Sequence, residues 1–202
     1  MPNIMIHEKV AYNIAQKHKN LDTPNFYLGA LAPDAVNLNG FASKEKRWTS
    51  HLRDKDLKVW RQNIIEFYYK EKNNYPSDFL KGYFIHILTD IIYDDYFYSS
   101  VTKRIKEDGK NITDPHPIML NYMNEYAIEN KNSKITKHIK NKLIEAAYYD
   151  IRNITKDNLK SWAKSQLEYA SVSSKANPYI NDDLITKLTN CVLAEYDNYI
   201  KE

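Results

Sequence analysis

Apolar positions recur at helical spacing along most of the chain. From about Ile4 to Lys17 they fall on one face with a period near 3.6 residues, which predicts an amphipathic helix. The same pattern predicts further helices: one through Trp60, Ile64 and Phe67; one from Ser77 to about Ser99; 117–129; 133–149; Leu159 to Tyr169; and Leu184 to Ile200. Only four glycines and seven prolines occur, which leaves little turn punctuation for a β-fold. We therefore expect an all-α protein.

Polar residues indicate where three of these helices begin. Thr49 or Ser50 is suited to cap the helix that runs through Trp60, because a hydroxyl oxygen accepts from the free amides of the first turn. Ser77 and Asn181 have the same role before the long third helix and the last one. No internal repeat or linker divides the chain, so residues 1–202 are expected to form a single helical domain.

Composition and charge narrow the class of protein. Hydrophobic residues make up 43% and charged residues 27% of the 202 positions, as in an ordinary folded domain with a sizeable core. The net charge is +3 and lysines alternate with acids, so no block of charge specifies nucleic acid. No signal-peptide pattern or membrane-spanning apolar run occurs, which favours a cytoplasmic protein. The lone cysteine, Cys191, is predicted to pack as a small hydrophobic residue.

The strongest chemical signal is the pair His86 and Asp90. They stand four residues apart in an uncharged, strongly helical run, so both side chains point the same way about one turn apart. The helical projection places them at the edge of an apolar stripe formed by Phe79, Leu80, Tyr83, Ile87 and Ile91. Burying an imidazole and a carboxylate there is costly without a cation or hydrogen-bond partners.

Three upstream residues extend this pair. His7 lies on the apolar face of the first helix, Asp34 follows the helix-breaking Pro33, and His51 follows Ser50. Imidazoles and carboxylates are the usual ligands of zinc at a centre that keeps one position open for water. Each residue also has an ordinary alternative: a hydrogen-bonded core histidine, a turn-capping aspartate, a surface histidine, or an intrahelical hydrogen bond.

Familiar catalytic motifs are missing from the sequence. There is no His-Glu-x-x-His, no Gly-x-x-x-x-Gly-Lys, no Gly-x-Ser-x-Gly and no adjacent His-Asp pair. These absences argue against metalloproteases, phosphate-loop enzymes, α/β-hydrolases and the helical phosphohydrolases built on a His-Asp dipeptide.

Four segments stand in a characteristic order: His7, Leu28-Gly29-Ala30-Leu31-Ala32-Pro33-Asp34, Ser50-His51 and Gly82-Tyr83-Phe84-Ile85-His86-Ile87-Leu88-Thr89-Asp90. In this order they resemble the zinc-dependent phospholipase C family. They have a wider likeness to the helical S1/P1-type nucleases. The resemblance covers roughly the first hundred residues, and the Ala-Pro-Asp and His-x-x-x-Asp segments are its most specific parts.

The resemblance implies an all-helical array that holds zinc and hydrolyses a phosphodiester with metal-activated water. It implies that Asp34, His51, His86 and Asp90 complete one site and that Asp90 bridges to a second ion held by His7. One or two zinc ions are therefore expected, with a small-molecule or lipid phosphodiester as substrate. No side chain is assigned as the general base.

The chain departs from the family where the remaining metal would bind. The family places a further histidine a few residues after the His-x-x-x-Asp pair, where Tyr96 stands here, and no His-x-x-x-Glu occurs. Candidate substitutes left open by the spacing are Asp94, Asp95, Asp114, His116 and Glu125. A full three-metal site is not expected.

Residues outside the ligand set leave alternatives open. The cations Lys44, Lys46 and Arg47 either bind a substrate phosphate or lie in a solvated loop. The rings of Tyr83, Tyr93 and Tyr96 either line a groove or belong to the core. His18 and His138, which stand among lysines, are expected to be solvated.

Two functions compete at this point. The first is metal-dependent hydrolysis of phosphoester bonds, and the second is a non-catalytic helical binding protein with one structural metal. Attachment to a membrane surface is a weaker third possibility, because no segment has a strongly basic amphipathic pattern.

Overall fold

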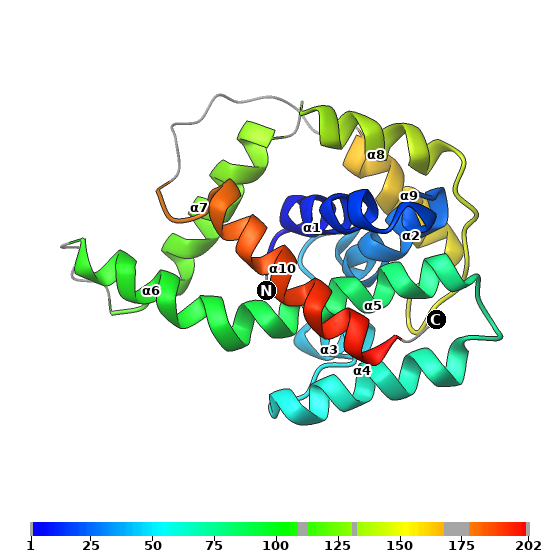
Figure 1. Cartoon of the computed structure of the whole chain (residues 1–202), viewed down its shortest axis with the longest axis horizontal. Helices are drawn as coiled ribbons and strands as arrows, with labels where there is room; N and C mark the ends of the chain where they lie inside the picture. The colour runs from blue at the N-terminus through cyan, green and yellow to red at the C-terminus, as the bar shows by residue number, and fades with distance from the viewer. Residues whose placement is uncertain (1, 109–112, 131–132, 168–177, 201–202) are drawn as a thin grey trace.

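The computed structural model describes residues 2–108, 113–130, 133–167 and 178–200, and in these ranges all regular structure is helical apart from one isolated bridge between Ile151 and Ile154 (Figure 1). The predicted all-α class is confirmed. The helices are α1 (Ile4–Lys17), α2 (Pro24–Leu31), α3 (Lys44–Ser50), α4 (Leu57–Glu71), α5 (Ser77–Ile92), α6 (Tyr98–Glu107), α7 (His116–Asn130), α8 (Lys134–Ile144), α9 (Lys156–Leu167) and α10 (Asp182–Tyr199). Two 3₁₀ turns, η1 (Lys19–Leu21) and η2 (Ala32–Asn37), and one π-helical turn, η3 (Tyr93–Phe97), complete the order.

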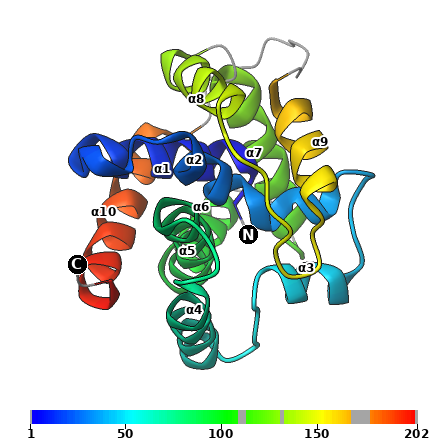
Figure 2. The same cartoon turned by 90° about the vertical axis from the view of Figure 1, so that its right-hand side faces the viewer.

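Helix α5 lies at the centre of the array. It packs against α1, α2, α4 and α10, which surround it in the two views of Figures 1 and 2. Every residue from Phe79 to Ile92 is buried, so the expected apolar stripe with a polar edge is wrong. A helix that is buried all round belongs inside a domain, and the polar side chains of His86 and Asp90 are therefore enclosed rather than placed at a surface.

Several helix boundaries agree with the sequence pattern. Helix α1 spans Ile4–Lys17 as predicted, and α7 and α9 fall on their predicted segments. Asn181 caps α10, because its side chain accepts a hydrogen bond from the amide of Leu184 at 3.1 Å. The predicted end near Tyr169 lies outside the described ranges.

Other boundaries differ from the prediction. Ser77 is the first residue of α5 rather than its cap, and Pro76 takes the cap position. The helical run does not stop near Ser99, because η3 and α6 continue it to Glu107. The helix predicted over 133–149 ends at Ile144.

The short helix α3 is missing from the sequence-based prediction. Ser43 caps it by accepting from the amide of Lys46 at 3.3 Å. Its other end is closed by a Schellman motif, in which the amide of Arg53 donates to the carbonyl of Trp48 at 2.9 Å around Leu52, whose φ is +53°. Leucine is unusual in this left-handed position, so the sequence lacks the glycine that normally signals such a helix end.

Thr49 and Ser50 belong to α3 and therefore do not cap the following helix. Helix α4 begins at Leu57, seven residues beyond Ser50, and Asp56 caps it by accepting from the amide of Lys58 at 2.7 Å. His51 accordingly stands at the end of one helix rather than at the start of the next.

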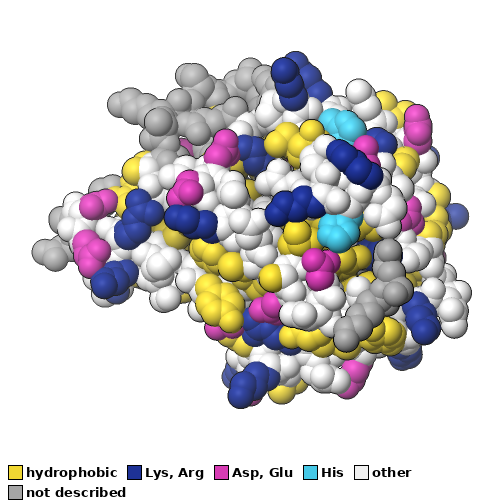
Figure 3. Space-filling view, in the orientation of Figure 1, with side chains coloured by type: hydrophobic (Ala, Val, Ile, Leu, Met, Phe, Trp, Pro, Cys, Tyr) yellow, Lys and Arg dark blue, Asp and Glu magenta, His cyan; other side chains and the backbone are white. Residues whose placement is uncertain are grey.

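The surface carries mixed charge. On the face drawn in Figure 3, Lys and Arg side chains are interspersed with Asp and Glu, as the alternation in sequence predicts. Cys191 is exposed, so its predicted burial is wrong; the neighbouring Val192 faces the core instead. Among the helices that the structure describes, none combines the length and the apolar character needed to cross a bilayer.

Candidate metal centre

The fold brings all five predicted ligand residues together. His7 comes from α1, Asp34 from η2, His51 from the C-cap of α3, and His86 and Asp90 from α5. Their side chains form two overlapping groups, His7/Asp34/His86 and His51/His86/Asp90, in each of which the ligand atoms lie within 4.8 Å of one another. These groups are close enough to hold a metal ion.

The carboxylate of Asp90 lies between the histidines. Its Oδ1 is 3.4 Å from Nε2 of His7, while its Oδ2 is 3.6 Å from Nε2 of His51 and 3.9 Å from Nε2 of His86. A second carboxylate approaches the same nitrogen, because Oδ1 of Asp34 is 3.4 Å from Nε2 of His51. One carboxylate oxygen thus faces α1 and the other faces the remaining imidazoles.

The three imidazoles lie against one another. The rings of His7 and His86 stack with centroids 3.7 Å apart and an interplanar angle of 6°, and Nε2 of His86 is 3.3 Å from Nε2 of His51. Nitrogen atoms that converge in this way repel one another if protonated. A cation bound between their lone pairs converts the repulsion into coordination.

Backbone carbonyls orient two of these rings. Nδ1 of His86 donates to the carbonyl of Ala30 at 2.7 Å, and Nδ1 of His51 donates to the carbonyl of Arg47 at 2.9 Å. A carbonyl only accepts, so the proton of each ring is fixed on Nδ1 and the lone pair of Nε2 points inward. Ser50 adds its hydroxyl 2.9 Å from Nδ1 of His51.

The backbone around His51 is held as firmly as its ring. The indole Nε1 of Trp60 donates to the carbonyl of His51 at 2.7 Å, and the hydroxyl of Tyr83 donates to the carbonyl of Ser50. Both donors are buried. The contacts join α3 to α4 and α5 and fix the end of a short helix at which the ligand stands.

The centre is almost closed to solvent. The side chains of His51, His86 and Asp90 are 0% exposed and that of His7 is 1% exposed, whereas that of Asp34 is 13% exposed. Both ring nitrogens of His7 and both carboxylate oxygens of Asp90 have no hydrogen-bond partner among the residues described. Unpartnered buried atoms of this kind are costly, and a cation would satisfy them.

Neighbouring histidines lower the pKa values of the two aspartates, Asp90 and Asp34. Burial alone would raise the pKa of Asp90, but the adjacent His7, His86 and His51 lower it well below its usual range. Burial would raise the pKa of Asp34 too, but His51, His86 and His7 together lower it. Both carboxylates are therefore ionised near neutral pH.

The pKa values of His86 and His51 are shifted in opposite directions. Burial and the neighbouring His7 lower the pKa of His86 to about 3, so this ring is neutral. Burial also acts to lower the pKa of His51, but Asp34 and Asp90 raise it overall. A metal ion competes with a proton at His51 and meets a free lone pair at His86.

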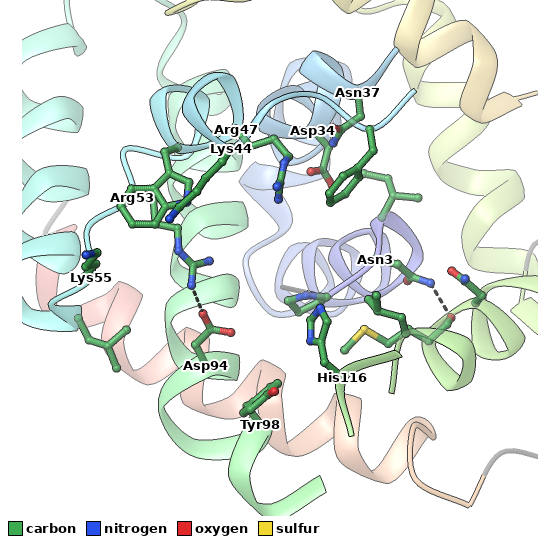
Figure 4. Close-up of a pocket in the computed structure, with 18 of the residues that line it drawn as sticks. Asn3, Asp34, Asn37, Lys44, Arg47, Arg53, Lys55, Asp94, Tyr98 and His116 are labelled. Carbon is green, nitrogen blue, oxygen red and sulfur yellow. Dashed lines mark hydrogen bonds and ion pairs between the residues drawn. The ribbon is translucent and has the colours of Figure 1, made fainter. Parts of the chain in front are cut away.

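A cleft of about 940 Å³ leads to this centre (Figure 4). Asp34 is the one ligand residue among those lining it, in keeping with its exposure. Of the cations predicted to meet a phosphate, Lys44 and Arg47 line the cleft and Lys46 does not. Further lining residues include Arg53, Lys55, Trp48, Phe41, Asp94, Tyr98, His116 and Trp162.

The candidate residues for a further metal lie outside the two ligand groups, although Asp94 and His116 line the cleft. Asp94 pairs with Arg53 at 2.7 Å and Asp95 pairs with Arg61 at 2.9 Å, so both carboxylates already have cationic partners. The two groups close enough to hold an ion, within the part of the chain described, include none of Asp94, Asp95, Asp114, His116 and Glu125. Tyr96, at the position of the family's histidine, is 57% exposed.

The structure also decides the positions of two tyrosines and of two histidines outside the ligand set. Tyr83 and Tyr93 belong to the core and do not line the cleft. His18 and His138 are half buried rather than solvated, since they lie 3.6 Å from Asp197 and 2.7 Å from Asp22.

Sequence reasoning missed two kinds of residue near the site. The cleft residues Arg53, Lys55 and Trp162 come from segments that no motif connects. Glu8, next to His7, is fully enclosed, and burial raises the pKa of its carboxyl to about 8. A single acid inside an amphipathic helix gives no sign of this, because the packing of distant helices determines it.

Comparisons with known proteins identify no relative of this chain. No protein-family model, no curated protein and no solved structure matches the chain. The functional argument therefore depends on the geometry of the site itself.

Proposed function

We propose that the chain is a zinc-dependent hydrolase of phosphoester bonds, of the kind found in the phospholipase C family that it resembles. The observation that carries the proposal is the convergence of His7, Asp34, His51, His86 and Asp90 at the end of a cleft lined with cations. Such a site combines metal ligands with groups that attract phosphate.

The donor set suits zinc. Three imidazole nitrogens and two carboxylates are borderline ligands of the type that zinc takes at catalytic centres, whereas calcium and magnesium prefer oxygen throughout. The shared position of Asp90, with one oxygen toward His7 and the other toward His51 and His86, supports either a single ion or two ions bridged by this carboxylate.

Bound zinc supplies a water molecule of lowered pKa and a positive charge beside the phosphoryl oxygens. Residues of the chain would bind the substrate and orient the metal ligands. Arg47 and Lys44 hold the anionic substrate at the mouth, and the carbonyl of Arg47 keeps His51 in its metal-binding tautomer. Asp34, the one partly exposed ligand, marks the side from which substrate arrives.

The experiment that tests the proposal measures zinc content and turnover together. Zinc per chain is determined by elemental analysis, and hydrolysis is followed with bis(p-nitrophenyl) phosphate. We expect Asp90→Asn and His86→Ala to lose zinc and activity together. Asp95→Asn is the matched control, because Asp95 follows on the same helical run but pairs with Arg61. Full activity in zinc-free protein would overturn the proposal.

One observation favours a second function. With four of the five ligand side chains no more than 1% exposed, the centre resembles a structural site, and a helical binding protein with a stabilising metal has the same ligands. This alternative predicts a large fall in melting temperature on chelation and no turnover in a broad panel of phosphoesters.

A further inference from the structure

We infer that the cleft beside the metal centre is a subsite for a second anionic group, so that the preferred substrate carries a phosphate in addition to the bond that is cleaved. This inference rests on the proposed function, because it assigns a substrate class to the same site. The inference also argues against a substrate with a quaternary-ammonium headgroup such as that of phosphocholine.

The charges that line the cleft favour an anion. Among the described residues that line the cleft, the cations are Lys44, Arg47, Arg53 and Lys55, and the carboxylates are Asp34 and Asp94. Asp34 belongs to the metal centre and Asp94 is paired with Arg53 at 2.7 Å. The uncompensated charge is therefore positive, and a partly enclosed cleft strengthens its attraction for an anion.

An unpartnered hydrogen-bond donor, the indole N–H of Trp162, also favours an anionic ligand. The indole Nε1 of Trp162 is buried and has no hydrogen-bond partner among the residues that the structure describes, although Trp162 lines the cleft. An indole N–H only donates, so it requires an acceptor. Phosphate oxygens are acceptors, whereas a trimethylammonium group offers none.

Two of the aromatic side chains that line the cleft, Trp48 and Phe41, are already covered by cations. Nζ of Lys44 lies 4.6 Å from the centre of the Trp48 ring, and the guanidinium of Arg47 lies 4.0 Å from that of Phe41. A quaternary ammonium ligand needs open aromatic faces. At Trp48 and Phe41 it would meet the positive charges of Lys44 and Arg47 instead, which repel it.

The place of Arg47 connects this subsite to the metal centre. Its carbonyl accepts from Nδ1 of His51, while its side chain lines the cleft and points into the same space as the carboxylate of Asp34 (Figure 4). An anion held by Arg47 therefore lies next to the metal ligands. This placement suits a ligand with two phosphates, one at each position.

The test is calorimetric titration of the full chain with inorganic pyrophosphate and, separately, with phosphocholine. Titrations are done on zinc-loaded protein and again after chelation. We expect pyrophosphate to bind at least about ten-fold more tightly than phosphocholine in both states. Lys44→Gln should weaken pyrophosphate binding by about five-fold, because one exposed charge contact is lost. Among the contacts that the structure describes, Lys44 makes a ring contact with Trp48 and no ion pair, so the fold should tolerate the change.

Lys46→Gln is the matched control, because Lys46 is exposed on the same helix but does not line the cleft. It should bind pyrophosphate as the wild type does. Equal or tighter binding of phosphocholine, or equal losses in Lys44→Gln and Lys46→Gln, would overturn the inference. Binding to chelated protein needs neither zinc nor turnover, so absent hydrolysis counts against the proposed function alone. Hydrolysis without a preference for pyrophosphate counts against the subsite alone.

Discussion

Gly29 of α2 and Gly82 of α5 each lie against the backbone of the helix that carries the other. A Cβ atom on Gly29 would stand 2.0 Å from the carbonyl oxygen of Phe79, and one on Gly82 would stand 2.0 Å from that of Phe26. The two helices can approach this closely only without side chains at the crossing. The approach brings the carbonyl of Ala30 within 2.7 Å of Nδ1 of His86, so the crossing also orients a metal ligand.

Gly82→Ala is therefore expected to destabilise the fold by about 3 kcal/mol or more, since the added methyl group meets rigid backbone and forces the helices apart. Thermal unfolding measures the loss. Gly40→Ala is the control: Gly40 has φ +103° but no atom within 4 Å of a Cβ, so only backbone strain of about 1 kcal/mol is expected. Equal stability of Gly82→Ala and wild type would show that the helices can separate freely.

Ser50→Ala is expected to weaken zinc binding by about ten-fold, the lower end for groups that orient a ligand histidine. The hydroxyl of Ser50 donates to the carbonyl of Arg47 at 3.0 Å and lies 2.9 Å from Nδ1 of His51. Because Arg47 still accepts from the ring, we expect weaker affinity rather than a lost site. Competition with a zinc-chelating dye gives the dissociation constant.

Thr49→Ala provides the comparison for Ser50→Ala. Thr49 is the neighbour of Ser50 on α3, and its hydroxyl makes no contact with His51 among the interactions described. Its zinc affinity should match that of the wild type. If both variants lose affinity equally, the effect comes from α3 as a whole and not from the contact with His51.

The ligand residues could be predicted from sequence because each has a local sign. His86 and Asp90 share one side of a helix at a spacing of four, and His7 lies on an apolar face. The buried location of His51 could not be predicted in the same way. It depends on α3, whose end uses Leu52 in a left-handed conformation and whose carbonyls are held by Trp60 and Tyr83 from other helices.

The cleft was predictable only in part. Lys44 and Arg47 stand close to His51 in sequence, so their charge could be connected with the site. The contribution of Trp162 depends on how α9 packs against η2, more than a hundred residues earlier in the chain. Such long-range packing has no sequence period to reveal it.

Zinc removal should lower the melting temperature of the wild type by roughly 10 °C. A ligand at about a thousand times its dissociation constant stabilises by about 4 kcal/mol, and each kcal/mol shifts a chain of this size by about 2–4 °C. Differential scanning fluorimetry with and without a chelator measures the shift. It should largely disappear in Asp90→Asn, which lacks the carboxylate between the three histidines, and persist in Asp95→Asn. An unchanged shift in Asp90→Asn would place the stabilising ion elsewhere.

Asp22 should make stability depend on pH. It lies 2.7 Å from Nε2 of His138 and 2.8 Å from the hydroxyl of Tyr27, and it lies 3.3 Å from Nζ of Lys142, so it ties α8 to the turn before α2. Burial would raise its pKa, but these contacts lower it below the ordinary value of 3.8.

A carboxyl with a lowered folded-state pKa contributes stability above its unfolded pKa and loses it as pH falls through the folded value. Asp22→Asn should therefore cost about 1 kcal/mol at pH 7, and this cost should shrink as the pH falls below 3.8 and through the lowered pKa of the folded state. Urea unfolding of both proteins at pH 7 and pH 3 measures the difference. Asp197→Asn is the control, because its contact with His18 at 3.6 Å is longer and more exposed. A cost for Asp22→Asn that stays constant with pH would mean that packing, rather than the charge of Asp22, stabilises this contact.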